Sequence, residues 1–327
     1  MTPLLRQSLR WVAMALVWAA ALYLLNKTLL SRIDWGAVTT HAYTAGEMRG
    51  VMAFAACFLV AMALRALRFH LLMNALRPLA LRDCVTIHLW GFAIGAITPM
   101  RVGEGVRLFW ARRREIPVAQ AVMVWVVERA SDLAMLLAIT GAATALVLLR
   151  RVMPDTLATG PVLALGAGLA VLTAAGLLLA KPGLALAQRC AARLPAPVAS
   201  QIASLGQGGR KLVEARVMAP FALLTLLVWA AMASAFFLGY SAFFGGLGPG
   251  GALLLLGLVN LSFLVAFLPG HVLGYHAVAA AVLTGFGAGP EQAAISSVVI
   301  HAVTISIVLL LGGIARLVRL VLRLDQV

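Results

Sequence analysis

Long apolar runs are the feature of this sequence that most restricts its fold. A helix needs about 20 apolar residues to cross the hydrocarbon core of a bilayer. Only 11% of the residues are charged, whereas about 25% is usual in a soluble domain, so a soluble fold could not cover its surface. We therefore predict an all-α polytopic membrane protein, with one transmembrane domain over residues 1–327. Its six spanning helices should lie at 11–25, 51–76, 118–149, 161–180, 217–244 and 292–314.

Two other apolar segments are short and are broken by proline. Residues 85–98 make a helix of about 14 residues, or about 21 Å at 1.5 Å per residue, and Pro99 ends it. That length cannot cross a core of about 30 Å. A second segment ends at Pro269 and resumes as a short helix over residues 271–286. We predict two re-entrant hairpins, at residues 83–114 and 251–286.

Lys and Arg are distributed unevenly around the predicted spans. With the N-terminus in the cytosol, cytosolic segments hold 20 of the 26 Lys and Arg residues, outer segments hold five, and Arg129 lies in the membrane. Cytosolic loops of membrane proteins carry such an excess, so both termini are expected in the cytosol. Anionic headgroups rather than nucleic acid then account for the net charge of +15. Residues 183–216, which are basic and divided by Pro195 and Pro197, are predicted to form a cytosolic amphipathic segment.

The two hairpins belong to an internal repeat. Residues 97–103 align with residues 267–274, and Arg129 in the helix that follows aligns with His301. The repeats cover residues 51–149 and 217–315, and the charge distribution makes their hairpins enter from opposite sides. Gly- and Pro-interrupted segments at matching positions of two such halves point to a transporter's substrate site. We therefore predict an inverted repeat around a central site.

The first hairpin carries several charged candidates. Pro99 and Gly103 mark its tip, where a helix N-terminus and Arg101 would attract a phosphate group. Glu104 and Arg107 are three residues apart and share a helix face. These residues form either a phosphate-headgroup cradle with Glu104 as a gate or proton carrier, or a Glu–Arg pair that only fixes the hairpin.

Charged residues also lie on two of the predicted spans. Glu128 and Asp132 share a face and repel each other unless an arginine such as Arg129 lies nearby. They form either a structural ion-pair network or the wall of a polar cavity that accepts a charged headgroup. Arg65 and Arg68, near the end of the 51–76 span, either extend to the lipid headgroups or line that cavity.

The second hairpin and the last span hold the remaining candidates. The two hairpin histidines are five residues apart, share no helix face and have no acidic partner in the turn, so no metal site is expected. The histidine of the last span is either a polar partner of this hairpin or an ordinary buried histidine. These candidates are Pro269, Gly270, His271, Gly274, His276 and His301.

The charged residues make up a motif that resembles a known family. They read Arg65-Ala-x-Arg68-Phe, then Pro99-x-Arg101-x-Gly103-Glu104-x-x-Arg107, then Glu128-Arg129-x-x-Asp132. Over nearly its whole length the chain resembles the lysylphosphatidylglycerol synthase transmembrane-region family, the flippase-like membrane domain of the bacterial multiple peptide resistance factor. The resemblance implies lipid translocation across the bacterial inner membrane, with the Arg/Glu cluster in the cavity. One branch is associated with hopanoid transport, and others accompany glycolipid or polyprenyl-lipid pathways.

The second hairpin departs from the family pattern. Relatives commonly read Pro-Gly-Gly-x-Gly followed closely by Glu, whereas here Tyr275 or His276 stands in that place. The departure indicates a different substrate or the loss of one coupling step.

Three functions fit these features. The first is a flippase or transporter that moves a polar-headed, hopanoid-type or polyprenyl-type lipid between leaflets. The second is a scaffold subunit of a lipid- or glycolipid-modifying enzyme complex, and the third is an embedded lipid transferase with Glu128 or Asp132 as its base. The inverted repeat favours the first, because a scaffold does not need two opposed hairpins. Without a Walker motif, dinucleotide loop or nucleophile elbow, ATP-driven transport by this chain alone is not expected. The transferase would lack a donor-binding domain, so we expect neither an enzyme nor a cofactor. The expected partners are the lipid and a lipid-biosynthetic enzyme, and an oligomer is compatible with either.

Overall fold

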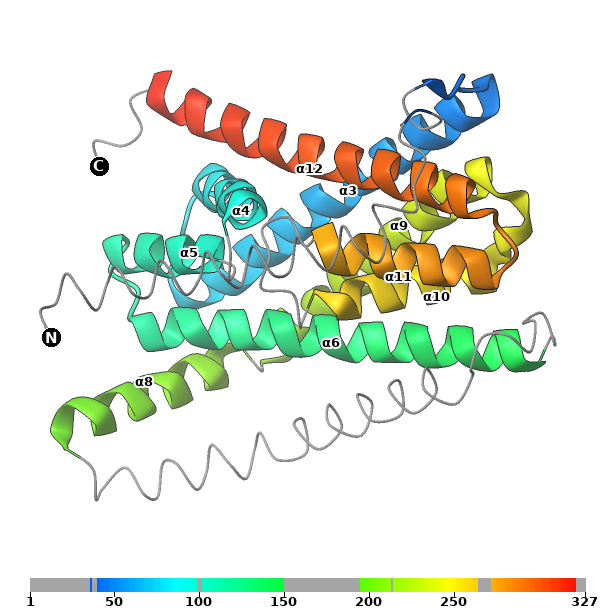
Figure 1. The fold of residues 1–327 in the computed structure, drawn as a ribbon. Coiled ribbons are helices and arrows are strands. Elements are labelled where there is room, and N and C mark those ends of the chain that lie inside the picture. Colours follow the sequence, from blue (N-terminus) through cyan, green and yellow to red (C-terminus); the bar gives the residue numbers. More distant parts are fainter. Residues whose placement is uncertain are drawn as a thin grey trace, which may run out of the picture.

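The described part of the chain is built from helices (Figure 1). The computed structural model describes residues 36, 40–98, 102–149, 195–212, 214–263 and 272–321. All regular elements within these ranges are helical, in agreement with the predicted all-α class. They are α3 (Ala45–Leu76), α4 (Leu81–Ile97), α5 (Val102–Arg113), α6 (Val118–Leu149), α8 (Ala196–Leu212), α9 (Ala215–Phe243), the 3₁₀ turn η3 (Gly245–Leu247), α10 (Gly248–Ser262), α11 (Val272–Gly285) and α12 (Pro290–Val321).

Five described segments are long and apolar enough to cross a bilayer, so the multi-pass membrane fold is confirmed. They are Ala45–Leu76, Val118–Val147, Ala215–Phe243, Gly245–Ser262 and Pro290–Val321. The spans predicted at residues 11–25 and 161–180 lie outside the described residues, and the count of six spans stays a prediction. The re-entrant character of the hairpins also stays a prediction, because α10 together with η3 meets the criterion for a span.

Local signals explain where the helices begin and end. The hydroxyl of Thr44 accepts a hydrogen bond from the backbone N–H of Glu47 at 3.2 Å, and the Glu47 carboxylate accepts one from the Thr44 N–H at 2.7 Å. This capping box satisfies N–H groups that the first turn of α3 would leave without partners. Pro117 directly precedes α6, where its fixed φ suits the start of a helix.

The helices pack in a reciprocal pattern around the two hairpins. The first arm of one hairpin, α4, packs against α12, and the first arm of the other, α10, packs against α6. The helices that precede the hairpins, α3 and α9, make the most extensive contact in the molecule. In Figure 1, α4 and α5 lie on the left and α10 and α11 on the right, between the long helices α6 and α12.

Small residues bring these helices close together. At each of the three main helix pairings a glycine faces its partner so closely that an added Cβ would lie about 2 Å from a partner atom, which is far inside van der Waals contact. Small residues at such positions allow the van der Waals packing that holds membrane helices together. The contacts are Gly50 against Ala242 in α9, Gly257 against Thr140 in α6, and Gly312 against Ala93 in α4.

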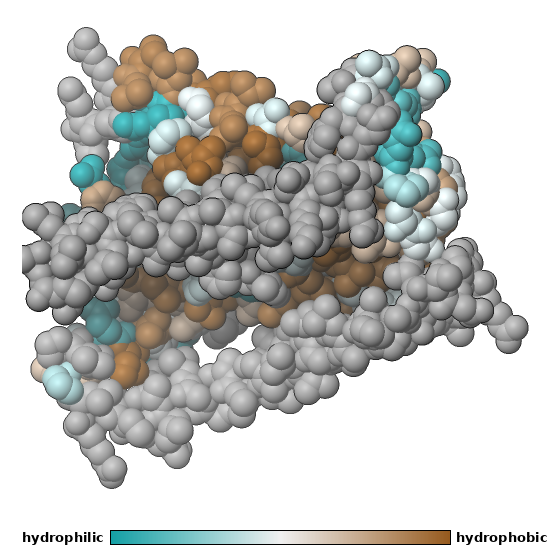
Figure 2. Space-filling view, in the orientation of Figure 1, coloured by the Kyte–Doolittle hydropathy of each residue, from teal (hydrophilic) through white to brown (hydrophobic). Residues whose placement is uncertain are grey.

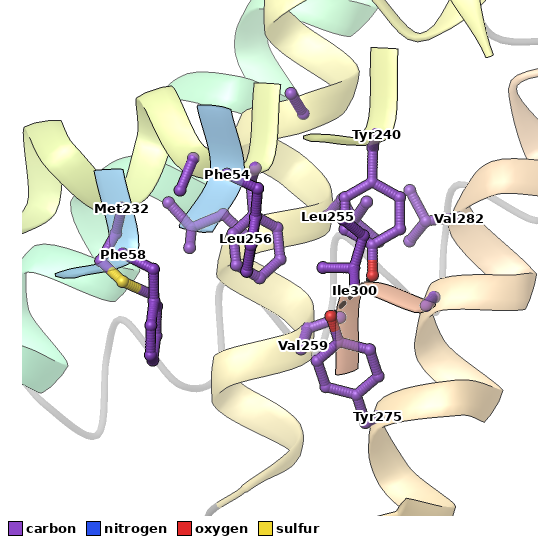
Figure 3. Packing of buried hydrophobic residues seen from close by; sticks show 14 of the residues in the cluster. Phe54, Phe58, Met232, Tyr240, Leu255, Leu256, Val259, Tyr275, Val282 and Ile300 are labelled. Atoms are coloured by element: carbon purple, nitrogen blue, oxygen red, sulfur yellow. Dashed lines mark hydrogen bonds between the residues drawn. The ribbon is translucent and has the colours of Figure 1, made fainter. Parts of the chain in front are cut away.

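The hydrophobic core lies between α3, α9, α10 and α12. Figure 3 shows Phe54 beside Leu256, and Tyr240 beside Leu255 and Ile300. In Figure 2, hydrophobic residues occupy much of the coloured surface, including the end of α12 at the upper left, and hydrophilic residues gather near the right-hand edge and in smaller patches on the left.

Basic residues gather at the end where α4 begins and α5 and α12 finish. Asp83 pairs with Arg114 at 3.1 Å and with Arg319 at 3.4 Å, which joins three helices there. The Nζ atom of Lys211 donates to the Leu76 carbonyl at 3.3 Å, so α8 lies at the same end. Toward the other end the described ranges contain Arg49. The basic residues of the first end are Arg77, Arg82, Arg112, Arg113, Arg114, Arg210, Lys211, Arg216, Arg316 and Arg319.

Candidate functional site

A cavity of about 490 Å³ lies where the two hairpins meet. This volume is within the usual range of small-molecule sites. Its lining comes from α3, α4, α5, α6, α9, α10, α11 and α12 together with Phe263, which follows α10. Most of the lining is apolar or aromatic. The charged lining residues, called the charged wall below, are Arg65, Glu104, Arg107, Arg129 and Asp132, and the neutral polar ones, called the opposite wall, are Asn260, Tyr275, His301 and Thr304.

Asp132 forms a buried ion pair with Arg68, which lies outside the cavity lining. The two terminal guanidinium nitrogens of Arg68, Nη1 and Nη2, donate to the two carboxylate oxygens of Asp132, at 2.7 and 3.0 Å. The hydroxyl of Thr225 lies 3.4 Å from the same guanidinium, so the pair joins α3, α6 and α9. Arg68 is only 1% exposed and is not among the residues that line the cavity. It therefore positions Asp132 and neither extends to the headgroups nor forms the wall.

Glu128 and Arg107 form a second buried ion pair, between α6 and α5. The Arg107 guanidinium also lies 4.1 Å from the centre of the Phe69 ring, at a distance suited to a cation–π contact. Spacing along α5 alone would pair Arg107 with Glu104. The structure pairs Arg107 across to α6 instead, because α5 and α6 pack against each other.

Arg129 and Arg65 are less closely paired with carboxylates than Arg107, the third arginine of the charged wall. Arg129 lies 3.9 Å from Glu104 and 3.7 Å from Asp132, both longer than the contacts of the two buried pairs. Arg65 forms no ion pair with any described residue, and its guanidinium lies 5.5 Å from the centre of the Trp229 ring. Among the described residues of this network, the four arginines Arg65, Arg68, Arg107 and Arg129 outnumber the three carboxylates Glu104, Glu128 and Asp132 by one.

The opposite wall is a network of aromatic and hydroxyl groups. The hydroxyls of Tyr240 and Tyr275 lie 2.7 Å apart and point toward each other (Figure 3). The Tyr275 ring stacks on the His301 ring, with centres 4.1 Å apart and planes 11° from parallel. Nδ1 of His301 lies 3.2 Å from Nε2 of His276, whose Nδ1 lies 3.1 Å from the Ser297 hydroxyl. His301 is thus a polar partner of the second hairpin.

The structure brings together seven of the predicted site residues on the cavity wall: Arg65, Gly103, Glu104, Arg107, Arg129, Asp132 and His301. Arg68, Glu128, Gly274 and His276 lie outside the lining, behind it or beside it. Five others lie outside the described residues: Pro99, Arg101, Pro269, Gly270 and His271. Within the described ranges, no three His, Cys, Asp or Glu residues are placed to hold a metal ion.

Sequence reasoning missed four contributors to the site: Tyr240, Trp229, Ser297 and Thr304. Tyr240 and Trp229 lie in an apolar helix that carries no motif, and Ser297 and Thr304 are two of several hydroxyl residues in α12. Tyr275 could be noticed from the sequence, because the second hairpin departs there from the pattern that the family resemblance implies.

The comparison with known families shows the family of this chain. Residues 10–312 match the profile of the lysylphosphatidylglycerol synthase TM region. The chain belongs to this family. The predicted resemblance is confirmed over most of the chain, and the charged cavity is a feature of a family member's membrane domain. No curated protein and no solved structure matched the chain.

Proposed function

We propose that this family member transports a lipid with an anionic, polar headgroup between the leaflets of the bacterial inner membrane. The observation that carries the proposal is the cavity of about 490 Å³ whose charged wall has one arginine more than it has carboxylates. Excess charge within membrane-spanning helices is costly and is typical of substrate and ion pathways. An anionic headgroup would balance it.

Arg65 and Arg129 are the side chains that would hold the headgroup. Both line the cavity, and neither has a carboxylate within the distance of the Arg68–Asp132 contacts. Guanidinium groups suit phosphate because their N–H groups can donate two parallel hydrogen bonds. Aromatic and aliphatic residues elsewhere in the lining, such as Phe58 and Phe236, would face the apolar part of the lipid.

The reciprocal packing of the helices supports transport by two inverted halves. Each hairpin packs on the long helix that follows the other hairpin, and the cavity lies between them. In transporters with inverted repeats, the halves move against each other around such a central site. The basic end of the molecule supports a topology with that end, and both termini, in the cytosol.

Transport is a better match to the site than catalysis. The two candidate bases, Glu128 and Asp132, each accept hydrogen bonds from an arginine in a buried ion pair. Both candidate bases are therefore already engaged by guanidinium groups. The lipid-biosynthetic enzyme predicted as a partner would supply or consume the transported lipid.

The test measures translocation of fluorescent lipids in vesicles that contain the purified protein. Fluorescent phosphatidylglycerol is the anionic probe and fluorescent phosphatidylcholine is the zwitterionic one. Hydrogen bonds to charged groups contribute about 1.5–3 kcal/mol, so Arg65→Gln and Arg129→Gln should each slow phosphatidylglycerol at least about tenfold. Arg82→Gln removes the same charge from the exposed basic end and should leave the rate unchanged. Equal rates for wild type and both cavity variants would refute the proposal.

A further inference from the structure

The lining of the cavity contains a buried hydrogen-bond donor that has no acceptor. Trp229, in α9, is 2% exposed and is one of the lining residues. Its one polar atom is the indole nitrogen Nε1, which carries a hydrogen and can only donate. That atom is buried and has no hydrogen-bond partner among the residues that the structure describes. A buried donor without an acceptor is unfavourable and rare in native proteins, so we expect an acceptor in another state of the protein.

Arg65 lies over the face of the same ring and does not engage its N–H group. The guanidinium carbon is 5.5 Å from the centre of the Trp229 ring, within the range of a cation–π contact. A cation in that position contacts the π electrons above the ring, whereas Nε1–H lies in the plane of the ring. Both groups are donors, so neither can satisfy the other. The pair therefore offers two kinds of donor to a ligand.

The surroundings of Arg65 favour an anion more than those of Arg129. An anion at Arg129 would also approach Glu104 and Asp132, whose carboxylates lie 3.9 and 3.7 Å from that guanidinium. Like charges at such distances repel each other. Within the described ranges, Arg65 has no carboxylate at ion-pair distance. The part of the cavity beside Arg65 and Trp229 is therefore the better place for a negatively charged group.

A second tryptophan shows that a missing partner alone does not mark a ligand site. Trp110, in α5, is 9% exposed, and its Nε1 atom also has no acceptor in the described part of the chain. Arg114 lies 5.8 Å from the centre of its ring. However, Trp110 does not line the cavity, and Arg114 pairs with Asp83 at 3.1 Å. Trp229 differs because its neighbouring arginine has no such carboxylate and both side chains border a space that can hold a ligand.

We propose that Trp229 is a substrate-binding residue whose indole N–H donates to a phosphate oxygen of the lipid headgroup while Arg65 holds the same phosphate. This inference rests on the proposed function and deepens it by placing the phosphate in a subsite between α3 and α9. A phosphate group has more than one acceptor oxygen and can accept from both residues at once. Because Nε1 is buried, the side chains that cover it must move when the headgroup enters.

The packing of α3 against α9 fixes the two donors relative to each other. These helices make the most extensive contact in the molecule, so their backbones hold Arg65 and Trp229 in place before a ligand arrives. Donors that are already in place bind more tightly, because less conformational freedom is lost on binding. The two residues also come from different halves of the predicted repeat, so each half contributes one donor to the subsite.

The first test measures the binding of dihexanoyl phosphatidylglycerol to the purified full chain by calorimetry. Trp229→Phe keeps an aromatic ring beside Arg65 but removes the N–H group. Because the lost hydrogen bond is made to a charged group, the affinity should fall by at least about tenfold. Trp110→Phe makes the same change at a buried donor outside the cavity and should leave the affinity unchanged. Dihexanoylglycerol, which has no phosphate, should bind equally to Trp229→Phe and to wild type.

The second test observes the indole N–H groups directly by NMR. The indole nitrogens of the seven tryptophans are labelled with ¹⁵N, and the signal that is absent from Trp229→Phe identifies Trp229. Phosphatidylglycerol should move the indole proton signal of Trp229 downfield, as a new hydrogen bond does, and should leave that of Trp110 in place. Glycerol phosphate, which has no acyl chains, should cause no such shift at the same concentration. An equal shift with glycerol phosphate would assign the subsite to a soluble phosphate ester and overturn the lipid.

The outcomes separate the two proposals. An unchanged affinity in Trp229→Phe, or wild-type indole signals that phosphatidylglycerol does not move, would overturn the role of Trp229 and leave lipid transport standing. An equal loss of affinity for phosphatidylglycerol and dihexanoylglycerol would also overturn it, because such a loss reflects the smaller ring and not the N–H group. An absence of phosphatidylglycerol binding by wild type would instead refute the proposed function.

Discussion

The buried Arg68–Asp132 pair is the contact whose disruption should most destabilise the protein. Asp132→Asn keeps the shape of the side chain but removes the charge that compensates Arg68, which is 1% exposed. Removing one partner of a buried ion pair costs about 3–5 kcal/mol, because the other charge remains in an apolar site. The Thr225 hydroxyl, 3.4 Å from the guanidinium, cannot supply a replacement charge.

The assay is thermal unfolding in detergent, followed by the fluorescence of the seven tryptophans. One kcal/mol shifts the melting temperature by about 2–4 °C in chains of 150–250 residues and by somewhat less in longer ones. Taking about 2 °C per kcal/mol, Asp132→Asn should lower the melting temperature by about 6–10 °C. The double variant Arg68→Met/Asp132→Leu replaces the pair with apolar groups and should recover most of this loss.

Arg77→Met provides the control, because it breaks an exposed ion pair. Arg77 and Glu115 are 2.6 Å apart, but their side chains are 46% and 78% exposed. Such pairs contribute at most about 1 kcal/mol, so the shift should stay within about 2 °C. The reasoning is refuted if Asp132→Asn is no more damaging than this control, or if the double variant is less stable than the two single changes added together.

Two further pairs of variants test the packing around the hairpins. Gly103→Ala should destabilise the protein by about 1–3 kcal/mol, because the added Cβ would lie 1.9 Å from the Gly91 carbonyl oxygen. Gly105→Ala should instead stabilise α5 by up to about 1 kcal/mol, because its added Cβ would have no atom within 4 Å. A higher melting temperature for Gly103→Ala than for Gly105→Ala would contradict the close packing of α4 and α5. Tyr240→Phe should lower the free energy of unfolding by about 1–3 kcal/mol, because the buried Tyr275 hydroxyl loses its partner. The double variant Tyr240→Phe/Tyr275→Phe should be nearly as stable as wild type in the same melting assay. Equal losses of stability in the single and double variants would contradict the hydrogen bond.

Helix positions could be predicted well because their signals are local. The helix predicted at residues 118–149 is found as Val118–Leu149, where Pro117 precedes the apolar run and Arg150 follows it. The hairpin predicted at residues 83–114 contains α5 and nearly all of α4, with Pro99 between them. In both cases a proline or a charged residue interrupts a hydrophobic run, and neither signal depends on distant parts of the chain.

Contacts between helices could not be predicted, because they depend on how the helices rotate and pack. Spacing along α5 favours a pair between Glu104 and Arg107, yet Arg107 reaches Glu128 in α6. Tyr240 and Tyr275 are 35 positions apart in apolar helices, and nothing in the sequence around Tyr240 marks it as the partner of Tyr275. Buried polar groups need hydrogen-bond partners. Which groups pair depends on the packing of the helices, and the sequence does not give that packing.

The difference between the two walls bears on how a repeated fold can act asymmetrically. Arg129 and His301 are aligned in the predicted repeat and line the same cavity from α6 and α12. Arg129 faces Glu104, whereas His301 faces another histidine. One half therefore lines the cavity with arginines and carboxylates, and the other lines it with aromatic, hydroxyl and amide groups. A repeated fold can in this way give the two sides of one cavity different chemistry.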